Sequence, residues 1–490
     1  MALVQIQENN TPPIKPGPWR LDLFQALPWL KRLVKMRSFQ FLVTLPTLIG
    51  FFAFLLAGIF GTPVGSHNII VVFVWILWWF VLITLLVPFG SRVWCTICPL
   101  PTLGEWMQRR SLVTVRSGNT PGTRNQLYGG LRRWPKKLSN IWMQNIGFMC
   151  LATFSALLVT RPMAGVIVLG LLIGIAAVMA LIWRHRVFCN YVCPVSGFLS
   201  LYSMTSTLEL RSKSKTVCAK CTSKSCAAGS EKGWACPWFI YMGKQDRNNY
   251  CGMCMECVKS CPNDNISLFL RPFCSDRKLK GYDEVWKASI MLVLAMAYSV
   301  VLLGPWGTLK GWADITEVGN WRGFAIYAGS LWFSSLVLMP ALLYLAVRAG
   351  RWLAARSAPL EGNSDVPGMK ELFIHYAYTM VPLGLLAWIA FSVPLLMVNG
   401  AYIVSVISDP LGRGWNIFGT ATVPWSPFHP ELMAYIQIPL LLIGLYYSLR
   451  TGIDLAREHW GDNRRAVLSL IPVAALMTLV TIVFLRLFVG

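Results

Sequence analysis

Apolar runs of about twenty residues recur along the chain, separated by shorter polar stretches. A run of this length can cross the hydrocarbon core of a bilayer as a single helix. Nine such runs lie near residues 40–60, 69–88, 141–160, 163–183, 286–304, 323–347, 371–398, 431–449 and 467–489. The pattern predicts a mainly α-helical fold, a polytopic membrane bundle of about nine spans.

The polar stretch between the fourth and fifth runs is long enough to form a separate domain. We expect a tail with an interfacial helix (1–39), a membrane unit (40–200), an inserted α+β domain (201–285) and a five-span membrane domain (286–490). Apolar and basic side chains alternate over 20–38 as in an interfacial helix, although Pro28 interrupts them. The proline-rich residues 1–19 are typical of a flexible tail, and they show no signal-peptide core.

Positive charge, which totals +23, is distributed by loop. Lysine and arginine are frequent before the first run and after the second, sixth and eighth runs, and rare in the loops between. This is the positive-inside pattern of a multi-pass protein of the inner membrane. It predicts a cytoplasmic amino terminus, a cytoplasmic inserted domain and an external carboxyl terminus. Anionic membrane lipid accounts for the basic loops, so we expect no nucleic-acid partner.

Eight cysteines fall within the inserted domain. The last four read Cys-x2-Cys-x2-Cys-x3-Cys-Pro, the bacterial ferredoxin signature, in which the cysteine before proline ligates the second of two [4Fe–4S] clusters. We therefore assign one cluster to Cys218, Cys221, Cys226 and Cys261. The other cluster is assigned to Cys236, Cys251, Cys254 and Cys257.

The first four of these cysteines depart from the standard spacing, with longer gaps before Cys226 and before Cys236. Zinc is an alternative, but it favours paired Cys-x2-Cys knuckles without the terminal Cys-Pro. Disulfides are another alternative, and they are rare in a cytosolic segment. The pattern predicts a two-cluster ferredoxin-like domain that transfers single electrons.

Four further cysteines close the first two pairs of apolar runs. The first pair ends in Arg-Val-Trp-Cys-x2-Cys-Pro and the second in Arg-Val-Phe-Cys-x3-Cys-Pro, so residues 40–200 resemble a duplicated unit. Both ends are expected on the cytoplasmic side, where their thiols can converge on a third iron–sulfur cluster or another soft metal. The alternative is a set of structural or redox-active thiols. The residues concerned are Cys95, Cys98, Cys189 and Cys193.

Paired Cys-Pro motifs beside membrane helices, followed by eight ferredoxin cysteines, resemble the NapH/NosR-type membrane polyferredoxins. The resemblance covers about residues 40–275. It implies electron transfer from the quinone pool towards periplasmic reductases, or support for the maturation of such enzymes. This chain differs from the family in its shorter first motif, Cys95-x2-Cys98-Pro99, in lacking an amino-terminal flavin domain, and in its five additional spans.

The five carboxyl-terminal spans contain no cysteine, and His375 is the one histidine within them. A transmembrane haem held by paired histidines is therefore not expected. Tyr378 and Thr379 follow His375 by three and four residues, on the same helix face. The group suits a quinone site formed by His375 and Tyr378, because an intramembrane ionisable residue is a functional candidate. The alternative is an aromatic belt that anchors the helix end.

These features together predict an electron-transfer protein of the inner membrane, acting between the quinone pool and a redox partner in a respiratory or periplasmic-reductase system. The expected cofactors are two [4Fe–4S] clusters, with a third metal site and a quinone as further candidates. Quinol, membrane lipid and either other subunits or an extracytoplasmic redox protein are the expected partners. Alternatives are a maturation or reactivation factor that donates electrons to a periplasmic metalloenzyme, and a transporter or sensor regulated by its clusters.

Overall fold

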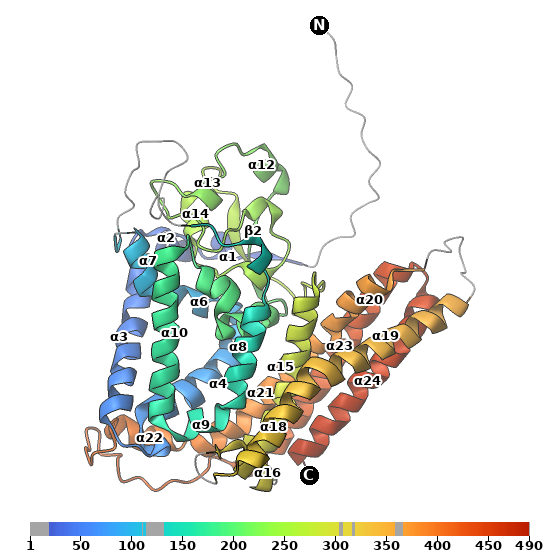
Figure 1. Ribbon diagram of the computed structural model, residues 1–490. Coiled ribbons are helices and arrows are strands. Elements are labelled where there is room, and N and C mark those ends of the chain that lie inside the picture. Colours follow the sequence, from blue (N-terminus) through green and yellow to red (C-terminus); the bar gives the residue numbers. More distant parts are fainter. Residues whose placement is uncertain are drawn as a thin grey trace.

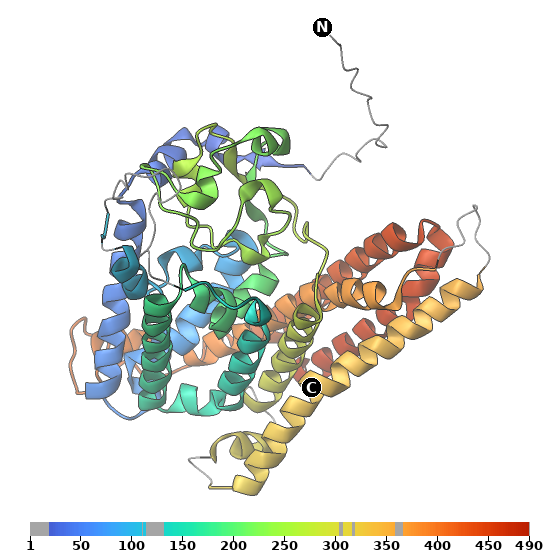
Figure 2. The same cartoon turned by 45° about the horizontal axis from the view of Figure 1, so that its top comes forward.

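Long helices account for most of the structure, and a small sheet lies at one end of them (Figure 1). The computed structural model describes residues 19–109, 111–113, 132–302, 307–315, 319–357 and 366–489. The cysteine-rich segment, drawn in light green, covers the upper end of the blue and green helices, and the yellow to red helices lean beside them (Figures 1 and 2). The proline-rich tail predicted over 1–19 lies almost wholly outside the described residues.

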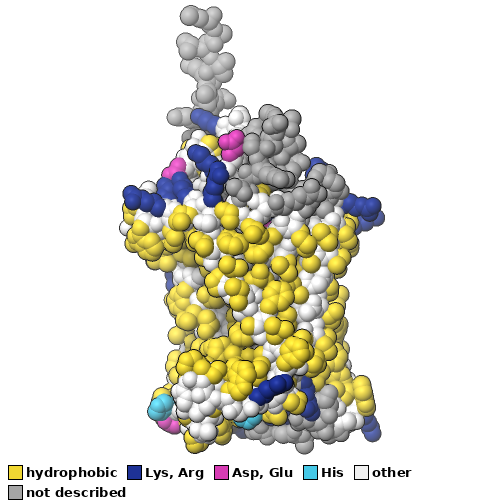
Figure 3. All heavy atoms as spheres, turned by 90° about the vertical axis from the view of Figure 1, so that its left-hand side faces the viewer, with side chains coloured by type: hydrophobic (Ala, Val, Ile, Leu, Met, Phe, Trp, Pro, Cys, Tyr) yellow, Lys and Arg dark blue, Asp and Glu magenta, His cyan; other side chains and the backbone are white. Residues whose placement is uncertain are grey.

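Eight helical segments in the described part of the chain are long and apolar enough to cross a membrane. They match eight of the nine predicted runs. Their bounds are Phe39–Phe60, Ile70–Gly90, Pro162–Ile182, Tyr282–Val301, Trp321–Arg356, Met369–Asn399, Pro430–Trp460 and Asn463–Phe488. Apolar side chains also dominate the flank of the molecule between its two ends (Figure 3).

The span predicted over 141–160 is wrong as a single helix. The chain forms α8 (Trp142–Thr153) and α9 (Ser155–Thr160), and the backbone of Phe154 leaves the helical region between them. Polar side chains hold α8 to its neighbours. Gln144 Nε2 donates to the carbonyl oxygens of Cys189 and Asn190, at 3.1 and 2.8 Å. A hydropathy window averages over such a break, so the sequence pattern shows one continuous run where the chain forms two shorter helices.

The first membrane unit contains α3 (Phe39–Phe60), α10 (Pro162–Ile182) and an irregular second span. That span combines π-helical turns with α4 (Trp79–Val81) and α5 (Val87–Gly90). Short helices follow the long ones on the side of the cysteine-rich domain. They are α6 (Trp94–Ile97), α7 (Thr102–Arg109) and α11 (Pro194–Tyr202).

The cysteine-rich domain contains an antiparallel sheet in the order β1 (Leu21–Asp22), β3 (Ile266–Leu270), β2 (Leu208–Ser212). Leu21 pairs with Leu270, and Leu208 pairs with Leu270 from the other side. Three short helices complete the domain. They are α12 (Lys215–Lys220), α13 (Ser225–Ala228) and α14 (Glu256–Ser260).

The amphipathic segment predicted over 20–38 forms two short helices rather than one. After β1 the chain forms α1 (Leu23–Ala26) and α2 (Pro28–Lys35), with Pro28 at the first position of α2, where proline is tolerated. Phe24 and Val34 are buried in the core of the cysteine-rich domain. The amino-terminal segment therefore belongs to that domain, because the edge of β3 and an apolar core are available to it.

The carboxyl-terminal half is a helix bundle packed beside the first unit. α21 (Met380–Asn399) lies at its centre, buried along most of its length between α15 (Tyr282–Leu302) and α23 (Met433–Trp460). Other helices lie around this core. They are α16 (Gly307–Ala313), α18 (Trp321–Phe333), α19 (Met339–Arg356), α20 (Met369–Tyr376) and α24 (Asn463–Val489). α22 (Tyr402–Ser408) follows α21 and contacts the second span of the first membrane unit instead (Figure 1).

Candidate metal centres

The structure brings the four cysteines at the ends of the first membrane unit together. We call Cys95, Cys98, Cys189 and Cys193 the helix-end group. Cys95 lies in α6 and Cys98 follows it, whereas Cys189 lies in a π-helical turn (Phe188–Val192) and Cys193 caps α11. All four line the same cavity, and three of them are buried. The duplicated sequence unit thus builds one site from two separate chain segments.

A repeated local conformation explains how each half reaches this site. A residue with positive φ precedes each cysteine pair, Ser91 at 59° and His185 at 65°. The second cysteine of each pair is extended, with ψ of 128° at Cys98 and 117° at Cys193. Proline follows both cysteines and disfavours the helical region for the residue before it. The Cys-Pro pairs therefore end one short helix and turn the chain towards the next.

Burial disfavours a thiolate in the helix-end group unless a cation or metal compensates it. Burial and the neighbouring Cys193 and Cys95 raise the pKa of the Cys98 thiol. Burial likewise raises the pKa of Cys193 to about 12. The backbone N–H of Ser196 donates to Cys193 Sγ at 3.4 Å, which favours the thiolate. The thiols of the helix-end group therefore need a bound cation before they become thiolates, the form in which cysteine binds an iron–sulfur cluster.

Buried charges surround the helix-end group. Arg186 Nη1 donates to the carbonyl oxygen of Cys95 at 2.7 Å, and its Nη2 lies 2.5 Å from Glu105 Oε2. Arg109 pairs with the same carboxylate. Burial by itself raises the pKa of Glu105, but Arg109 and Arg186 outweigh burial and hold that pKa below its ordinary value. The group therefore sits beside an ionised and nearly water-free network.

The second set of four, which we call the inner group, comprises Cys236, Cys251, Cys254 and Cys257. All four are buried, and Cys251, Cys254 and Cys236 add to the effect of burial in raising the pKa of Cys257. Burial raises the pKa of Cys236 to about 12. Met253 and Met255 adopt positive φ angles of 54° and 63°, which turn the loop tightly between the cysteines. The backbone N–H of Met253 donates to Cys251 Sγ at 3.4 Å.

The third set, which we call the outer group, comprises Cys218, Cys221, Cys226 and Cys261. These four line one small cavity, and Cys221 and Cys261 are partly exposed. Asn265 donates to two of the sulfurs, from its backbone N–H to Cys261 Sγ at 3.4 Å and from Nδ2 to Cys218 Sγ at 3.3 Å. Hydrogen bonds from Ser223 and the Lys224 backbone lower the pKa of Cys221. The quartets therefore contain the same residues that the ferredoxin pattern groups together.

The three groups follow one another through the molecule. Cys226 of the outer group is an electrostatic neighbour of Cys236 and Cys257 in the inner group. The guanidinium of Arg186 interacts electrostatically with Cys254 of the inner group and with Cys189 of the helix-end group. The cysteine-rich domain is thus attached directly to the short helices of the first membrane unit.

Hydrogen bonds hold this attachment. Arg92 Nη1 donates to the carbonyl oxygen of Asn249, and its Nη2 lies 2.6 Å from Ser196 Oγ. Thr96 Oγ1 lies 3.0 and 2.9 Å from the carbonyl oxygens of Gly252 and Met253. Because Arg92 and Thr96 belong to the Cys95 motif, the same segment shapes two neighbouring sites.

The spacing of the cysteines bears on the zinc and disulfide alternatives. Sulfurs around one tetrahedral zinc ion lie about 3.8 Å apart, given a Zn–S distance of about 2.3 Å. Among the described residues, the one group of three His, Cys, Asp or Glu donors within 4.8 Å of one another is Glu371, His375 and His459. The cysteine groups are therefore wider than a single-zinc site, and all fourteen cysteines are unpaired. Four thiols around a wider space fit an iron–sulfur cluster.

An apolar cavity of about 450 Å³ adjoins the helix-end group. Pockets for small organic ligands have volumes of this order and are mostly apolar. Trp75 and Trp78 line the cavity, and their buried indole N–H groups have no hydrogen-bond partner among the described residues. Buried Trp N–H groups usually find a partner, so these two point to a missing acceptor. Sequence reasoning missed the cavity; the tryptophan-rich second span was its only local sign.

His375 and Tyr378, the residues predicted to share a quinone site, have different neighbours. His375 Nδ1 lies 2.7 Å from His459 Nε2. Tyr378 is fully buried beside Cys274 and Arg271. α20 ends at Tyr376 and a 3-10 turn follows it, which changes the helical spacing that the prediction assumed. Neither residue is among those that line the apolar cavity.

Comparison with known proteins agrees with the duplicated unit. Residues 71–117 and 164–209 each match the family model described as a 4Fe-4S binding domain. Each match contains one cysteine pair of the helix-end group, whereas the eight cysteines of 218–261 lie outside both. An uncharacterized protein of Methanocaldococcus jannaschii is 32% identical over 80 residues, which are 16% of this chain and 29% of that protein. No solved structure matches the chain.

The two family matches support bound [4Fe–4S] clusters and an electron-transfer role. They are consistent with a ferredoxin-type iron–sulfur protein, and the eight apolar helices are consistent with a membrane location.

Proposed function

We propose that this protein exchanges single electrons between a lipophilic quinone and a redox partner that meets the cysteine-rich domain. The observation that carries the proposal is the position of the helix-end group, whose four thiols line an apolar cavity of about 450 Å³ among membrane-type helices. When bound, [4Fe–4S] clusters supply one-electron oxidation and reduction. The chain itself would hold three of them, one in each cysteine group.

The cavity offers what a quinone head group needs. Its lining is almost entirely apolar and aromatic, which suits a ring with an isoprenoid tail. Trp75 and Trp78 line the cavity, and a rotation of their rings would turn the buried indole N–H groups towards a quinone carbonyl as donors. This proposal places the quinone beside the helix-end group rather than at His375 and Tyr378.

The outer group offers the other terminus. Cys221 and Cys261 are partly exposed, so a protein partner can approach this end of the chain of cysteine groups closely. Basic loops near the same end support a cytoplasmic position in the inner membrane, by the positive-inside rule. A redox protein or further subunit would then dock on the cysteine-rich domain.

Quinol reduction of the purified full chain tests the proposal. Under anaerobic conditions we expect a quinol analogue to produce the EPR signals of reduced clusters. Trp75→Phe and Trp78→Phe keep an aromatic side chain but remove the indole N–H. Each should therefore raise the quinol concentration needed for half-maximal cluster reduction about fivefold, equivalent to about 1 kcal/mol for one hydrogen bond.

A pair of glycines supplies a matched control. Gly50 lines the cavity, and a Cβ added there meets nothing within 4 Å. Gly50→Leu should therefore fill part of the cavity and slow reduction. Gly170 in α10 is equally unobstructed but does not line the cavity, so Gly170→Leu should behave like the wild type. Signals that appear with dithionite but never with quinol would refute the quinone proposal and leave the clusters in place.

A further inference from the structure

We propose that Glu371, His375 and His459 bind a divalent transition-metal ion, of the zinc or ferrous type, at one end of the carboxyl-terminal bundle. Donor atoms of the three side chains all lie within 4.8 Å of one another. The site contains no cysteine and is separate from the three cysteine groups, so this inference goes beyond the electron-transfer function.

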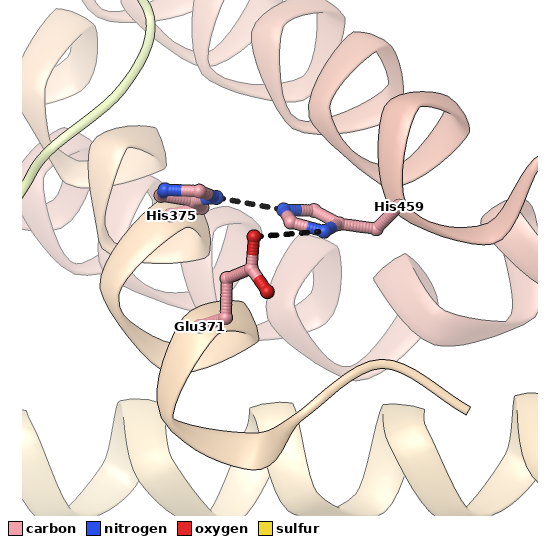
Figure 4. A group of neighbouring side chains, drawn as sticks. All are labelled: Glu371, His375 and His459. Carbon is pink, nitrogen blue, oxygen red and sulfur yellow. Dashed lines mark hydrogen bonds and ion pairs between the residues drawn. The ribbon is translucent and has the colours of Figure 1, made fainter. Parts of the chain in front are cut away.

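Two helices bring the three donors together (Figure 4). Glu371 and His375 are four residues apart in α20 and therefore project from one face of it. His459 is the penultimate residue of α23 and points towards that face. A metal ion here would link α20, at the start of one apolar segment, to the last turn of α23.

The donor set suits zinc or ferrous iron. Two imidazoles and one carboxylate form the His2Glu set of several zinc sites and the facial triad of non-haem iron sites. His375 Nδ1 and His459 Nε2 lie 2.7 Å apart, and His459 Nδ1 lies 3.9 Å from Glu371 Oε1. Ring nitrogens around a tetrahedral zinc ion lie about 3.3 Å apart, given Zn–N distances of about 2.0–2.1 Å. A small separation of the two rings would therefore admit the ion.

The environment leaves one side of the site open. The His459 side chain is 9% exposed, whereas Glu371 is 60% exposed. Three protein ligands with a solvent-facing side leave a position for water, as in exchangeable rather than structural zinc sites. The other charged groups that influence the histidines, Lys278 and Glu458, form an ion pair at 2.8 Å. Their charges cancel, so neither opposes a cation strongly.

The site lies where the cysteine-rich domain joins the carboxyl-terminal bundle. Lys278 pairs with Glu458, and Arg277 pairs with Asp454 at 2.6 Å, so the segment that leaves the domain is held on α23. His459 follows Glu458 directly. A bound ion would therefore fix α20 against the same stretch of α23 that anchors the domain.

Zinc retention by the full chain in detergent tests this site. Purified protein is incubated anaerobically with Zn²⁺ and desalted, and zinc per chain is measured by mass spectrometry. His375→Gln and His459→Gln keep hydrogen-bonding capacity but remove a strong ligand, so each should lose about one zinc per chain relative to wild type. Zn²⁺ should also raise the unfolding temperature of the wild type and leave these two variants unchanged.

His429 provides the matched control, because it contacts Glu431 at 3.1 Å and the described residues place no third donor beside the pair. His429→Gln should retain as much zinc as the wild type. Equal zinc in all four proteins, or an equal loss in His429→Gln, would overturn the site and leave His375 and His459 as a hydrogen-bonded pair. Iron content and cluster absorbance, measured in the same samples, report on the electron-transfer proposal independently.

Discussion

The helix-end and outer cysteine groups each contain four thiols, but their surroundings are opposite in character. Cys98 and Cys193 lie against an apolar cavity, and burial raises the pKa of both thiols. Cys221 is partly exposed, and neighbouring hydrogen bonds lower its pKa. Cluster potentials depend on net charge, hydrogen bonds to sulfur and exposure to solvent. One ligand pattern can therefore give two sites that differ in potential and in the partners able to reach them.

The helix-end group also depends on buried charge, unlike the outer group. Arg186, Glu105 and Arg109 form an enclosed network beside it. Near the outer group, Asp264 instead forms surface ion pairs with Lys31 and Lys35. A buried pair is costly to break because its partner is left charged and unsolvated, whereas a surface pair is screened by water. The two ends of the cysteine series should respond very differently to charge removal.

The largest expected effect comes from removing a ligand of the helix-end group. Cys193→Ser should lower the iron content by about four atoms per chain, the content of one [4Fe–4S] cluster, and remove one set of reduced-cluster EPR signals. Cys150→Ser is the control, because Cys150 is an exposed thiol in α8 outside all three groups. Unchanged iron in Cys193→Ser would mean that the helix-end thiols hold no cluster. Only the inner and outer groups would then remain as cluster sites.

The next effect concerns the buried network. Glu105→Gln should destabilise the protein by about 3–5 kcal/mol, because it leaves Arg109 and Arg186 buried without their shared counter-charge. Asp264→Asn, at the outer end, should cost no more than about 1 kcal/mol. Thermal or denaturant unfolding followed by tryptophan fluorescence measures both. Equal losses would contradict the contrast between a buried and a solvated end.

The same carboxyl predicts a pH dependence. Because the pKa of folded Glu105 is below its ordinary value, its contribution to stability is complete above the unfolded pKa of about 4.3. That contribution is lost as the pH falls through the folded pKa. Below about pH 4.3 the unfolding temperature of the wild type should therefore fall more steeply than that of Glu105→Gln. Parallel curves would show that Glu105 is not ionised in the folded protein.

The smallest effect concerns the potential of the outer group. Asn265→Ala removes the Nδ2 donor to Cys218 Sγ while keeping the backbone donor to Cys261. Hydrogen bonds to sulfur stabilise the more negative, reduced state, so the midpoint potential of one cluster should fall by tens of millivolts. A potentiometric EPR titration measures this shift. A shift in every cluster signal would indicate a general disturbance.

Several features could be predicted from the chain alone because they depend on short-range patterns. Eight of nine spans follow from runs of apolar residues, which have to be covered by lipid or protein whatever their neighbours are. The ferredoxin spacing grouped Cys218, Cys221 and Cys226 with Cys261, the residues that share one cavity in the structure. The repeat of Arg-Val-aromatic-Cys likewise indicated that the two helix ends are equivalent.

Other features depend on contacts between distant segments, which no local pattern records. Residues 21–22 become a strand because the edge of β3 lies beside them, and the third predicted run is divided into two helices at Phe154. The apolar pattern predicts that His375 is an intramembrane histidine, but it does not indicate His459, the hydrogen-bond partner 84 residues away.

The sequence by itself determined the ligands and the apolar segments, because thiol chemistry and hydrophobicity belong to individual residues and short runs. Tertiary structure alone decided that the helix-end thiols face an apolar cavity with two unpaired indole donors. It also decided that Arg186 stands between two cysteine groups and that two distant histidines meet. These arrangements are properties of packing, since they arise where surfaces from separate segments exclude water together.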